Sequence, residues 1–350
     1  MKVPVSSGLP VEVAAGLAAT PGKLRRGQSL FEANPLLPGR SLLARSRLPL
    51  VHAALADCRL CAHRCGVNRL AGEQGPCHAG TEACVFTAQV EVSDEVELVP
   101  TFAIALSGCD LRCAFCITGA ESWNVRAGEP CDPALIAQRA EASLENGART
   151  VMILGGEPTI HLPTVLEIVA ALPEDARLVW KTNAHGSAEA RELLDGLFDV
   201  WLADYKFGND ACAERLARVP DYTRTVQENL IWMFGSSAGA DVRRLDSLSD
   251  FGPRTSEGPS KSVSRRSRMG AARSELMVRH LVMPGHVECC WRPVAEWLAE
   301  NLPGVKVNLR TGFWPAWQAT RCPELAGTVS PAEAARAAAI ARDLQLNLIR

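Results

Sequence analysis

Three cysteines in one short segment form the strongest candidate site in the sequence. Cys109, Cys113 and Cys116 have a C-x3-C-x2-C spacing and follow an apolar run at 101–106. Such a run is typical of a buried strand, so we expect the thiols on the loop that leaves it. A closed zinc or iron–sulfur site uses four protein ligands, whereas three thiolates leave one metal position free. The segment therefore predicts a metal centre whose chemistry takes place at the free position.

A second group of cysteines precedes this loop. Its members have a C-x2-C-x3-C-x11-C spacing and are Cys58, Cys61, Cys65 and Cys77. A C-x2-C turn lets two thiolates meet one ion, and four thiolates complete a tetrahedral shell. We therefore predict a closed site that holds either structural zinc or a second iron–sulfur cluster. His63 is either a substitute ligand or an exposed histidine in this turn.

The elements that must position these residues alternate between strand and helix. Continuous apolar runs predict strands at 101–106, 150–154, 177–183, 199–206, 277–285 and 305–310. Helical patterns are found at 130–146, 162–172, 188–197, 210–218, 222–233, 288–301 and 331–343. Alternating β and α units imply a parallel sheet, either doubly wound or a barrel. Six units with polar residues at the strand ends favour an α/β fold with a partial (β/α)6 barrel and an N-terminal Cys-rich extension.

Composition shifts divide the chain into three parts. Residues 1–49 are expected to form a partly ordered extension, residues 50–100 a Cys-rich metal-binding segment, and residues 101–350 the partial barrel. Within the barrel, residues 236–274 are dominated by Ser, Gly, Arg, Asp and Pro, which predicts a disordered insertion. Its basic stretch at 261–268 is either a nucleic-acid contact or a solvated loop, and composition favours the loop.

The global composition excludes some partners. The 350 residues carry a formal net charge of −2, so neither nucleic acid nor an anionic membrane is expected as a partner. No apolar run reaches the ~18 residues that cross a bilayer. The thirteen cysteines cluster at metal-ligand spacings, which favours reduced thiolates in the cytoplasm over disulfides. Cys289 and Cys290 are adjacent in an expected helix, where neighbouring side chains diverge, so this pair is not expected to chelate one metal.

The cysteine loop resembles the signature of the radical S-adenosylmethionine (SAM) superfamily. That signature is C-x3-C-x-aromatic-C, with Phe115 as the aromatic residue, and a Gly155-Gly156-Glu157-Pro158 segment follows the second strand. The resemblance implies a [4Fe–4S] cluster on the three cysteines, with SAM bound at the open iron. It also implies reductive cleavage of SAM to a 5′-deoxyadenosyl radical that abstracts hydrogen from a substrate. Phe115 would face the adenine, and Gly155, Gly156, Glu157 and Pro158 would form the edge that meets the methionyl amine.

Later segments resemble pyruvate formate-lyase-activating enzymes and their uncharacterised homologues. Asp204 and Lys206 end one strand and Arg279 lies in the next, which makes them candidates for contacts to SAM or for an ion pair at the strand ends. Asn183, at the end of the 177–183 strand, is a further cofactor-binding candidate. The segment 181–183 departs from the activating-enzyme pattern, which carries an acidic residue with Asn-Gly there. Activation of a glycyl radical enzyme therefore does not follow from the resemblance.

These observations predict an oxidoreductase of the radical SAM type. Its target is either a partner protein, as for an activating enzyme, or a peptide or small metabolite, with the Cys58–Cys77 site as an auxiliary cluster. The alternative hypothesis is a protein that is not an enzyme, namely an iron–sulfur electron carrier or scaffold. The Gly-Gly-Glu-Pro segment argues against it, because such a protein does not need a site for SAM. The expected partners are SAM, an electron donor such as flavodoxin or ferredoxin, and a protein substrate.

Overall fold

The computed structural model describes residues 39–93, 95–238 and 274–349. The expected N-terminal extension up to residue 38, and residues 239–273 of the expected insertion, lie outside the described residues. All described residues belong to one compact unit. Within them, no helix has the length and apolar character needed to cross a membrane.

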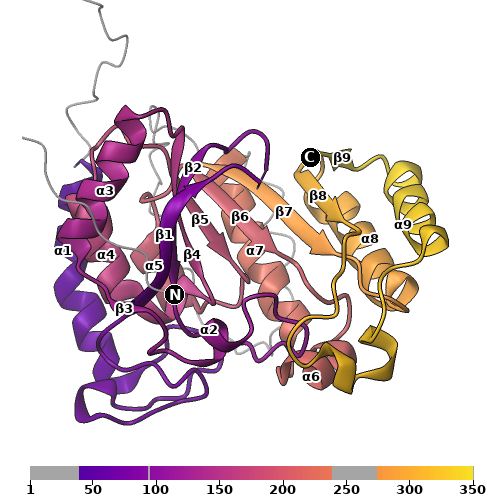
Figure 1. The fold of residues 1–350 in the computed structure, drawn as a ribbon, viewed down its shortest axis with the longest axis horizontal. Helices are drawn as coiled ribbons and strands as arrows, with labels where there is room; N and C mark the ends of the chain where they lie inside the picture. Colours follow the sequence, from indigo (N-terminus) through magenta and orange to yellow (C-terminus); the bar gives the residue numbers. More distant parts are fainter. Residues whose placement is uncertain (1–38, 94, 239–273, 350) are drawn as a thin grey trace, which may run out of the picture. The chain divides into compact units, whose positions relative to one another are not determined.

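The described chain builds one nine-stranded sheet, shown in Figure 1, in the order β3-β1-β2-β4-β5-β6-β7-β8-β9. The strands are β1 (Cys84–Glu91), β2 (Thr101–Leu106), β3 (Glu129–Pro130), β4 (Thr150–Gly155), β5 (Leu178–Thr182), β6 (Val200–Asp204), β7 (Glu275–Leu281), β8 (Lys306–Arg310) and β9 (Asn347–Leu348). From β2 to β9 all neighbours pair in parallel, whereas β1 pairs antiparallel with both β2 and β3. The predicted α/β fold, with six parallel strands at its centre, is confirmed.

Helix α1 precedes the first strand, and the other helices lie between strands along the chain. The helices are α1 (Arg40–Ala53), α2 (Ala120–Trp123), α3 (Pro133–Glu145), α4 (Leu162–Ala171), α5 (Ala188–Leu194), α6 (Asp210–Ala217), α7 (Tyr222–Ala238), α8 (Arg292–Asn301) and α9 (Pro331–Asp343). Shorter turns are η1 (Ala54–Asp57), η2 (Arg69–Ala71), η3 (Pro158–His161), η6 (Ala319–Arg321), η7 (Pro323–Leu325) and the π-helical turn η5 (Val287–Trp291). The central parallel strands bury apolar side chains on both faces, which explains their continuous apolar runs.

Side-chain caps explain why several helices begin where they do. Asp132 accepts hydrogen bonds from the first turn of α3, Ser187 from that of α5, and Asn209 from that of α6. At α9, Ser330 and Glu333 form a reciprocal capping box. These residues satisfy backbone N–H groups that have no partner within the helix.

Helix α1 spans the expected boundary at residue 49. It packs against α4 on one face of the sheet (Figure 1) and buries Ala44 and Val51. Arg40 at its start pairs with Asp199, just before β6, at 2.8 Å. Residues 40–49 are therefore part of the α/β unit, together with the sheet they cover.

Candidate active site

The three-cysteine loop leaves β2 at the carboxyl edge of the sheet. Gly108 turns the chain there with a φ of +84°, and an added Cβ would lie 2.4 Å from the side chain of Val125. The loop is then tied to the end of α6, because the backbone N–H groups of Arg112 and Ala114 donate to the carbonyls of Ala217 and Leu216. Helix α6 therefore fixes the position of the thiols.

One cavity of about 770 Å³ collects most of the predicted site residues. Its walls include Cys109, Cys113, Phe115, Cys116, Gly155, Gly156, Asn183, Asp204, Lys206 and Arg279. These residues come from the ends of β2, β4, β5, β6 and β7, so the candidate site lies at the carboxyl edge of the sheet. The volume is within the range of small-molecule and cofactor sites.

The backbone of Gly155 and Gly156 lies directly against the cysteine loop. A Cβ on Gly155 would be 2.1 Å from the carbonyl oxygen of Leu106, and one on Gly156 would be 2.0 Å from that of Gly108. The N–H of Gly156 donates to Leu106 and the N–H of Glu157 donates to Gly108, both at 2.9 Å. Only glycine fits at this junction, which leaves the cavity wall free of side chains where β4 ends.

Glu157 and Pro158 are buried behind this wall, and neither lines the cavity. The Glu157 carboxylate accepts hydrogen bonds from Thr159, from the Thr182 hydroxyl at 2.9 Å and from the Asn183 N–H at 2.8 Å. Burial and the nearby Asp110 carboxylate raise the pKa of Glu157 to about 7, although these hydrogen bonds oppose the shift. Glu157 therefore joins the ends of β4 and β5 and holds the edge in place.

Asp204, Lys206 and Arg279 form a charged group on the opposite wall. Lys206 Nζ lies 2.5 Å from Asp204 Oδ2, and Arg279 Nε lies 3.9 Å from Asp204 Oδ1 and 3.1 Å from the buried Glu95. Burial would raise the pKa of Asp204, but Lys206 and Arg279 lower it below its usual value. Burial would lower the pKa of Lys206, but Asp204 and then Cys113 raise it. The predicted ion pair is present, and its members also face the cavity.

The buried thiols are electrostatically coupled to this cation. Burial raises the pKa of Cys113 to about 12, and Lys206 is the main group that opposes the shift. Burial and Asp110 raise the pKa of Cys109 well above its usual value. A deprotonated set of thiols at this position thus needs a compensating positive charge, which bound iron supplies.

A buried polar network beside Cys109 was not found from the sequence. The Asp110 carboxylate accepts hydrogen bonds from His185 Nδ1 and Asn183 Nδ2, both at 2.7 Å, and His63 Nε2 donates to the Asp110 carbonyl at 3.0 Å. Burial would raise the pKa of Asp110, but the hydrogen bond from His185 lowers it. Asn183 Nδ2 also lies 3.7 Å from Cys109 Sγ. The network fixes the first cysteine of the loop against the end of β5.

The N-terminal cysteine segment packs against the same region. Cys61 forms a β-bridge with Gly186, and the Ala62 N–H donates to the His185 carbonyl. Cys58, Cys61 and Cys77 are buried and Cys65 is half-buried. Among the described residues, the groups that bring three or more ligand atoms within 4.8 Å of one another are His63 with Asp110 and His185, and Cys212 with His286, Cys289 and Cys290; the N-terminal cysteines do not form such a group. A closed metal site at the N-terminal group stays a prediction.

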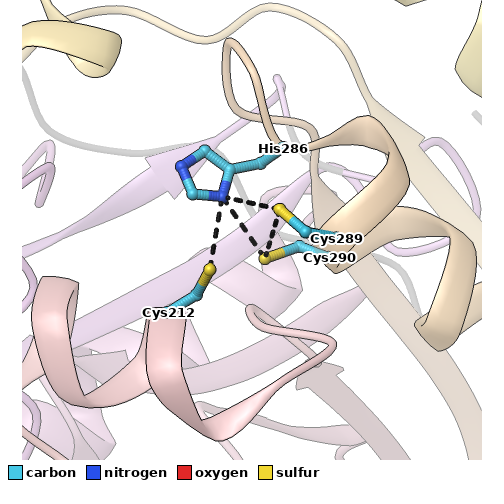
Figure 2. A group of neighbouring side chains, drawn as sticks. All are labelled: Cys212, His286, Cys289 and Cys290. Atoms are coloured by element: carbon cyan, nitrogen blue, oxygen red, sulfur yellow. Dashed lines mark hydrogen bonds between the residues drawn. The ribbon is translucent and has the colours of Figure 1, made fainter.

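The expectation that Cys289 and Cys290 diverge is wrong. Both lie in η5, where the Trp291 N–H donates to the His286 carbonyl in an i→i+5 hydrogen bond. The wider turn brings the two Sγ atoms to 4.0 Å, on the same side as His286 (Figure 2).

An open parallel sheet with a cysteine loop and a glycine edge at one cavity defines a cofactor-dependent α/β enzyme. Residues 104–230 match the family model described as the radical SAM superfamily. A domain of this family implies a [4Fe–4S] cluster and SAM as cofactors. Three cavity thiols beside a side-chain-free wall fit this pair.

Two curated relatives are similar in sequence. An uncharacterised protein of Methanocaldococcus jannaschii is 26% identical over 329 residues, which cover 91% of this chain and 84% of that protein. A probable RNA methyltransferase of Aromatoleum aromaticum is 28% identical over 126 residues, or 34% of this chain and 35% of that one. Among solved structures, the crystal structure of Streptococcus suis SuiB bound to SAM is similar to this chain. The two are 15% identical, with a TM-score of 0.45 over 69% of this chain and 47% of SuiB. SuiB bound to its precursor peptide SuiA gives 14% identity and the same TM-score over 46% of SuiB.

Proposed function

We propose that this protein cleaves SAM reductively and uses the resulting radical to abstract hydrogen from a substrate. Cys109, Cys113 and Cys116 would hold the [4Fe–4S] cluster. The observation that carries the proposal is the single cavity shared by these thiols, the glycine edge and the charged group on the opposite wall. When bound, the cluster supplies the electron that cleaves SAM into methionine and a 5′-deoxyadenosyl radical.

The cavity residues have complementary roles in this proposal. The exposed backbone of Gly155 and Gly156 can accept the methionyl ammonium, and Asp204, Lys206 and Arg279 offer charges of both signs to its polar groups. Phe115 gives the cavity an apolar surface, and Phe207 packs edge-on against it at 5.9 Å. Leu111 and Phe115 are buried, so they exclude water from the cysteine loop. Binding, orientation and shielding are therefore assigned to separate residues.

Anaerobic reconstitution tests the proposal directly. Protein loaded with iron and sulfide, then given dithionite and SAM, should produce 5′-deoxyadenosine and methionine. Alanine at Cys109, Cys113 or Cys116 should abolish this product, whereas Cys131→Ala, a half-buried thiol that does not line the cavity, should retain it. If the cluster is intact and no 5′-deoxyadenosine forms, the protein is an electron carrier and the assignment as an enzyme is refuted.

We further infer that the substrate is a polypeptide. Ile117 and Trp314 both line the cavity, yet their side chains are 79% and 69% exposed. Trp317, 44% exposed, lies nearby against Gly119 and Trp123. Large apolar side chains at a cavity mouth are typical of surfaces that bind a partner chain. The polypeptide is either a segment of a partner protein or a peptide that the enzyme modifies, since both would bind this apolar surface. In both cases the cluster needs an electron donor such as flavodoxin or ferredoxin.

Deuterium transfer distinguishes the substrate classes. Cells grown on deuterated medium supply separate pools of protein, RNA and small metabolites, each of which is incubated with the reconstituted enzyme and SAM. Mass spectrometry should find deuterium in 5′-deoxyadenosine only with the protein pool, and Ile117→Ser/Trp314→Ser should lower this incorporation while uncoupled SAM cleavage persists. Incorporation from RNA or metabolites instead would overturn the polypeptide assignment.

For the N-terminal cysteines we propose a metal site that holds either zinc or an auxiliary cluster. Burial raises the pKa values of Cys61 and Cys77, and Asp110 contributes to both shifts, so the group lies close to the active loop. Metal analysis of a variant with alanine at Cys109, Cys113 and Cys116 isolates this group. Iron and sulfide in that variant would identify a cluster; one added equivalent of zinc, lost in Cys61→Ser/Cys77→Ser, would identify a structural site. A metal content unchanged by Cys61→Ser/Cys77→Ser would refute the site.

A further inference from the structure

Four potential ligands from two separate segments converge outside the SAM cavity. Cys212 lies in the first turn of α6, His286 precedes η5, and Cys289 and Cys290 lie in it, as Figure 2 shows. All four ligand atoms lie within 4.8 Å of one another. His286 Nδ1 is 3.6 Å from Cys212 Sγ, 3.3 Å from Cys289 Sγ and 3.5 Å from Cys290 Sγ.

We propose that Cys212, His286, Cys289 and Cys290 bind one structural Zn²⁺ ion. With Zn–S bonds of about 2.3 Å and a Zn–N bond of about 2.0 Å, tetrahedral angles place sulfur and nitrogen about 3.5 Å apart and two sulfurs about 3.8 Å apart. The S···N distances in the structure span 3.3–3.6 Å, and Cys289 Sγ lies 4.0 Å from Cys290 Sγ. These four distances fit a single tetrahedral ion, and the two remaining S···S distances, from Cys212 Sγ, are at most 4.8 Å.

The spacing excludes two other arrangements. A disulfide requires an S–S distance of about 2.05 Å, and the cysteines of the group are free. A [4Fe–4S] cluster carries each thiolate on a different iron, so its ligands spread around a larger body than one ion. With four protein ligands no position stays open for a substrate, which is the pattern of a structural rather than a catalytic site.

Hydrogen bonds from a neighbouring residue orient the cysteine ligands, as is common around metal-bound thiolates. Asn209, the N-cap of α6, donates from Nδ2 to Cys212 Sγ at 3.3 Å and to the Cys289 carbonyl at 2.6 Å. Asn209 Nδ2 also lies 3.8 Å from Cys290 Sγ. Such donors stabilise the negative charge of a three-thiolate zinc centre and hold its ligands in position.

The position of the site indicates what the ion would stabilise. Gly208 and Asn209 follow directly after Lys206 and Phe207, which belong to the SAM cavity and its packing. The far end of α6 holds the three-cysteine loop through Leu216 and Ala217. Zinc would therefore lock α6 to the segment after β7, and through α6 it would support the cluster loop.

Zinc content and coordination test the site. Anaerobically purified protein from zinc-supplemented cells should lose one equivalent of zinc per chain on Cys289→Ser or His286→Ala, and the control Cys131→Ser should lose none. His286→Cys keeps four ligands and should retain the ion, which separates metal loss from misfolding. X-ray absorption at the zinc edge, recorded in a Cys61→Ser/Cys77→Ser background that removes zinc from the N-terminal group, should report a three-sulfur, one-nitrogen shell that is absent when Cys289→Ser is added. Equal zinc in wild type and Cys289→Ser, or a disulfide within the group, would overturn the proposal.

Discussion

A methyl group at Gly156 should separate the cysteine loop from the end of β4. The added Cβ would lie 2.0 Å from the Gly108 carbonyl oxygen and 3.1 Å from Cys109 Cβ. Real Cβ atoms keep at least 3.0 Å from such atoms, so the two segments must move apart by about 1 Å. The obstacle is backbone on both sides, which cannot turn away as a flexible side chain would.

The cost can be worked out for stability and for catalysis. Overpacking of this kind typically costs about 1–3 kcal/mol. A displacement of about 1 Å at a reacting centre can lower the rate about 100-fold. Gly156→Ala should therefore bind iron close to the wild-type amount but form 5′-deoxyadenosine far more slowly.

The assay compares three quantities in matched preparations. These are iron and sulfide content, the thermal unfolding temperature and the rate of 5′-deoxyadenosine formation. Gly327→Ala is the control, because no atom lies within 4 Å of its added Cβ. A wild-type rate for Gly156→Ala would show that the junction tolerates a side chain and would refute the close-contact argument.

Three further perturbations test buried titratable residues in the site and elsewhere in the sheet. Asp110→Asn weakens a buried charged hydrogen bond and should cost about 1–3 kcal/mol in urea unfolding of the cluster-free protein; an unchanged midpoint would contradict this. Lys206→Met should weaken SAM binding at least ~10-fold by calorimetry, about 1.4 kcal/mol, because Asp204 loses its main cation; equal affinity would exclude Lys206 from the site. Burial lowers the pKa values of His161 and His280 to about 4, below the unfolded 6.5, so unfolding takes up protons and their contribution to stability falls from pH 6.5 toward pH 4. The destabilisation caused by His280→Asn should thus shrink by roughly 3 kcal/mol over this range, and a constant difference would refute the shift.

The sheet core was predictable because its strands are buried on both faces. The runs 101–106 and 305–310 differ from β2 and β8 by at most one residue. Strand β1 was missed, because it lies toward the sheet edge and carries a mixed pattern from Cys84 to Glu91 instead of a continuous apolar run. Strands β3 and β9 have two residues each, too few to produce any periodic signal.

The site was predictable where one short segment carried the pattern. Cys109, Cys113 and Cys116 are close in sequence, so their spacing alone indicates shared chemistry. Asp110 and His185 are 75 residues apart, and only the pairing of parallel strands brings them to 2.7 Å. The prediction for Cys289 and Cys290 was wrong for a different reason. The sequence of η5 contains no residue that requires a π-turn, and the rule for an α-helix gives the wrong direction for one of the two thiols.

The two cysteine groups outside the cluster loop attach next to the ends of two neighbouring strands, β5 and β6, that line the cavity. The segment around Cys61 is bonded to residues that follow Asn183, and the Cys212 group is bonded to Asn209, which follows Lys206. Both proposed metal sites would thus fix backbone next to cavity residues without entering the cavity themselves. Since neither contributes a ligand to the cluster, removal of the zinc proposed at Cys212 should lower SAM affinity and thermal stability before it lowers the iron content. A loss of iron in direct proportion to zinc would instead make the two centres one cooperative unit.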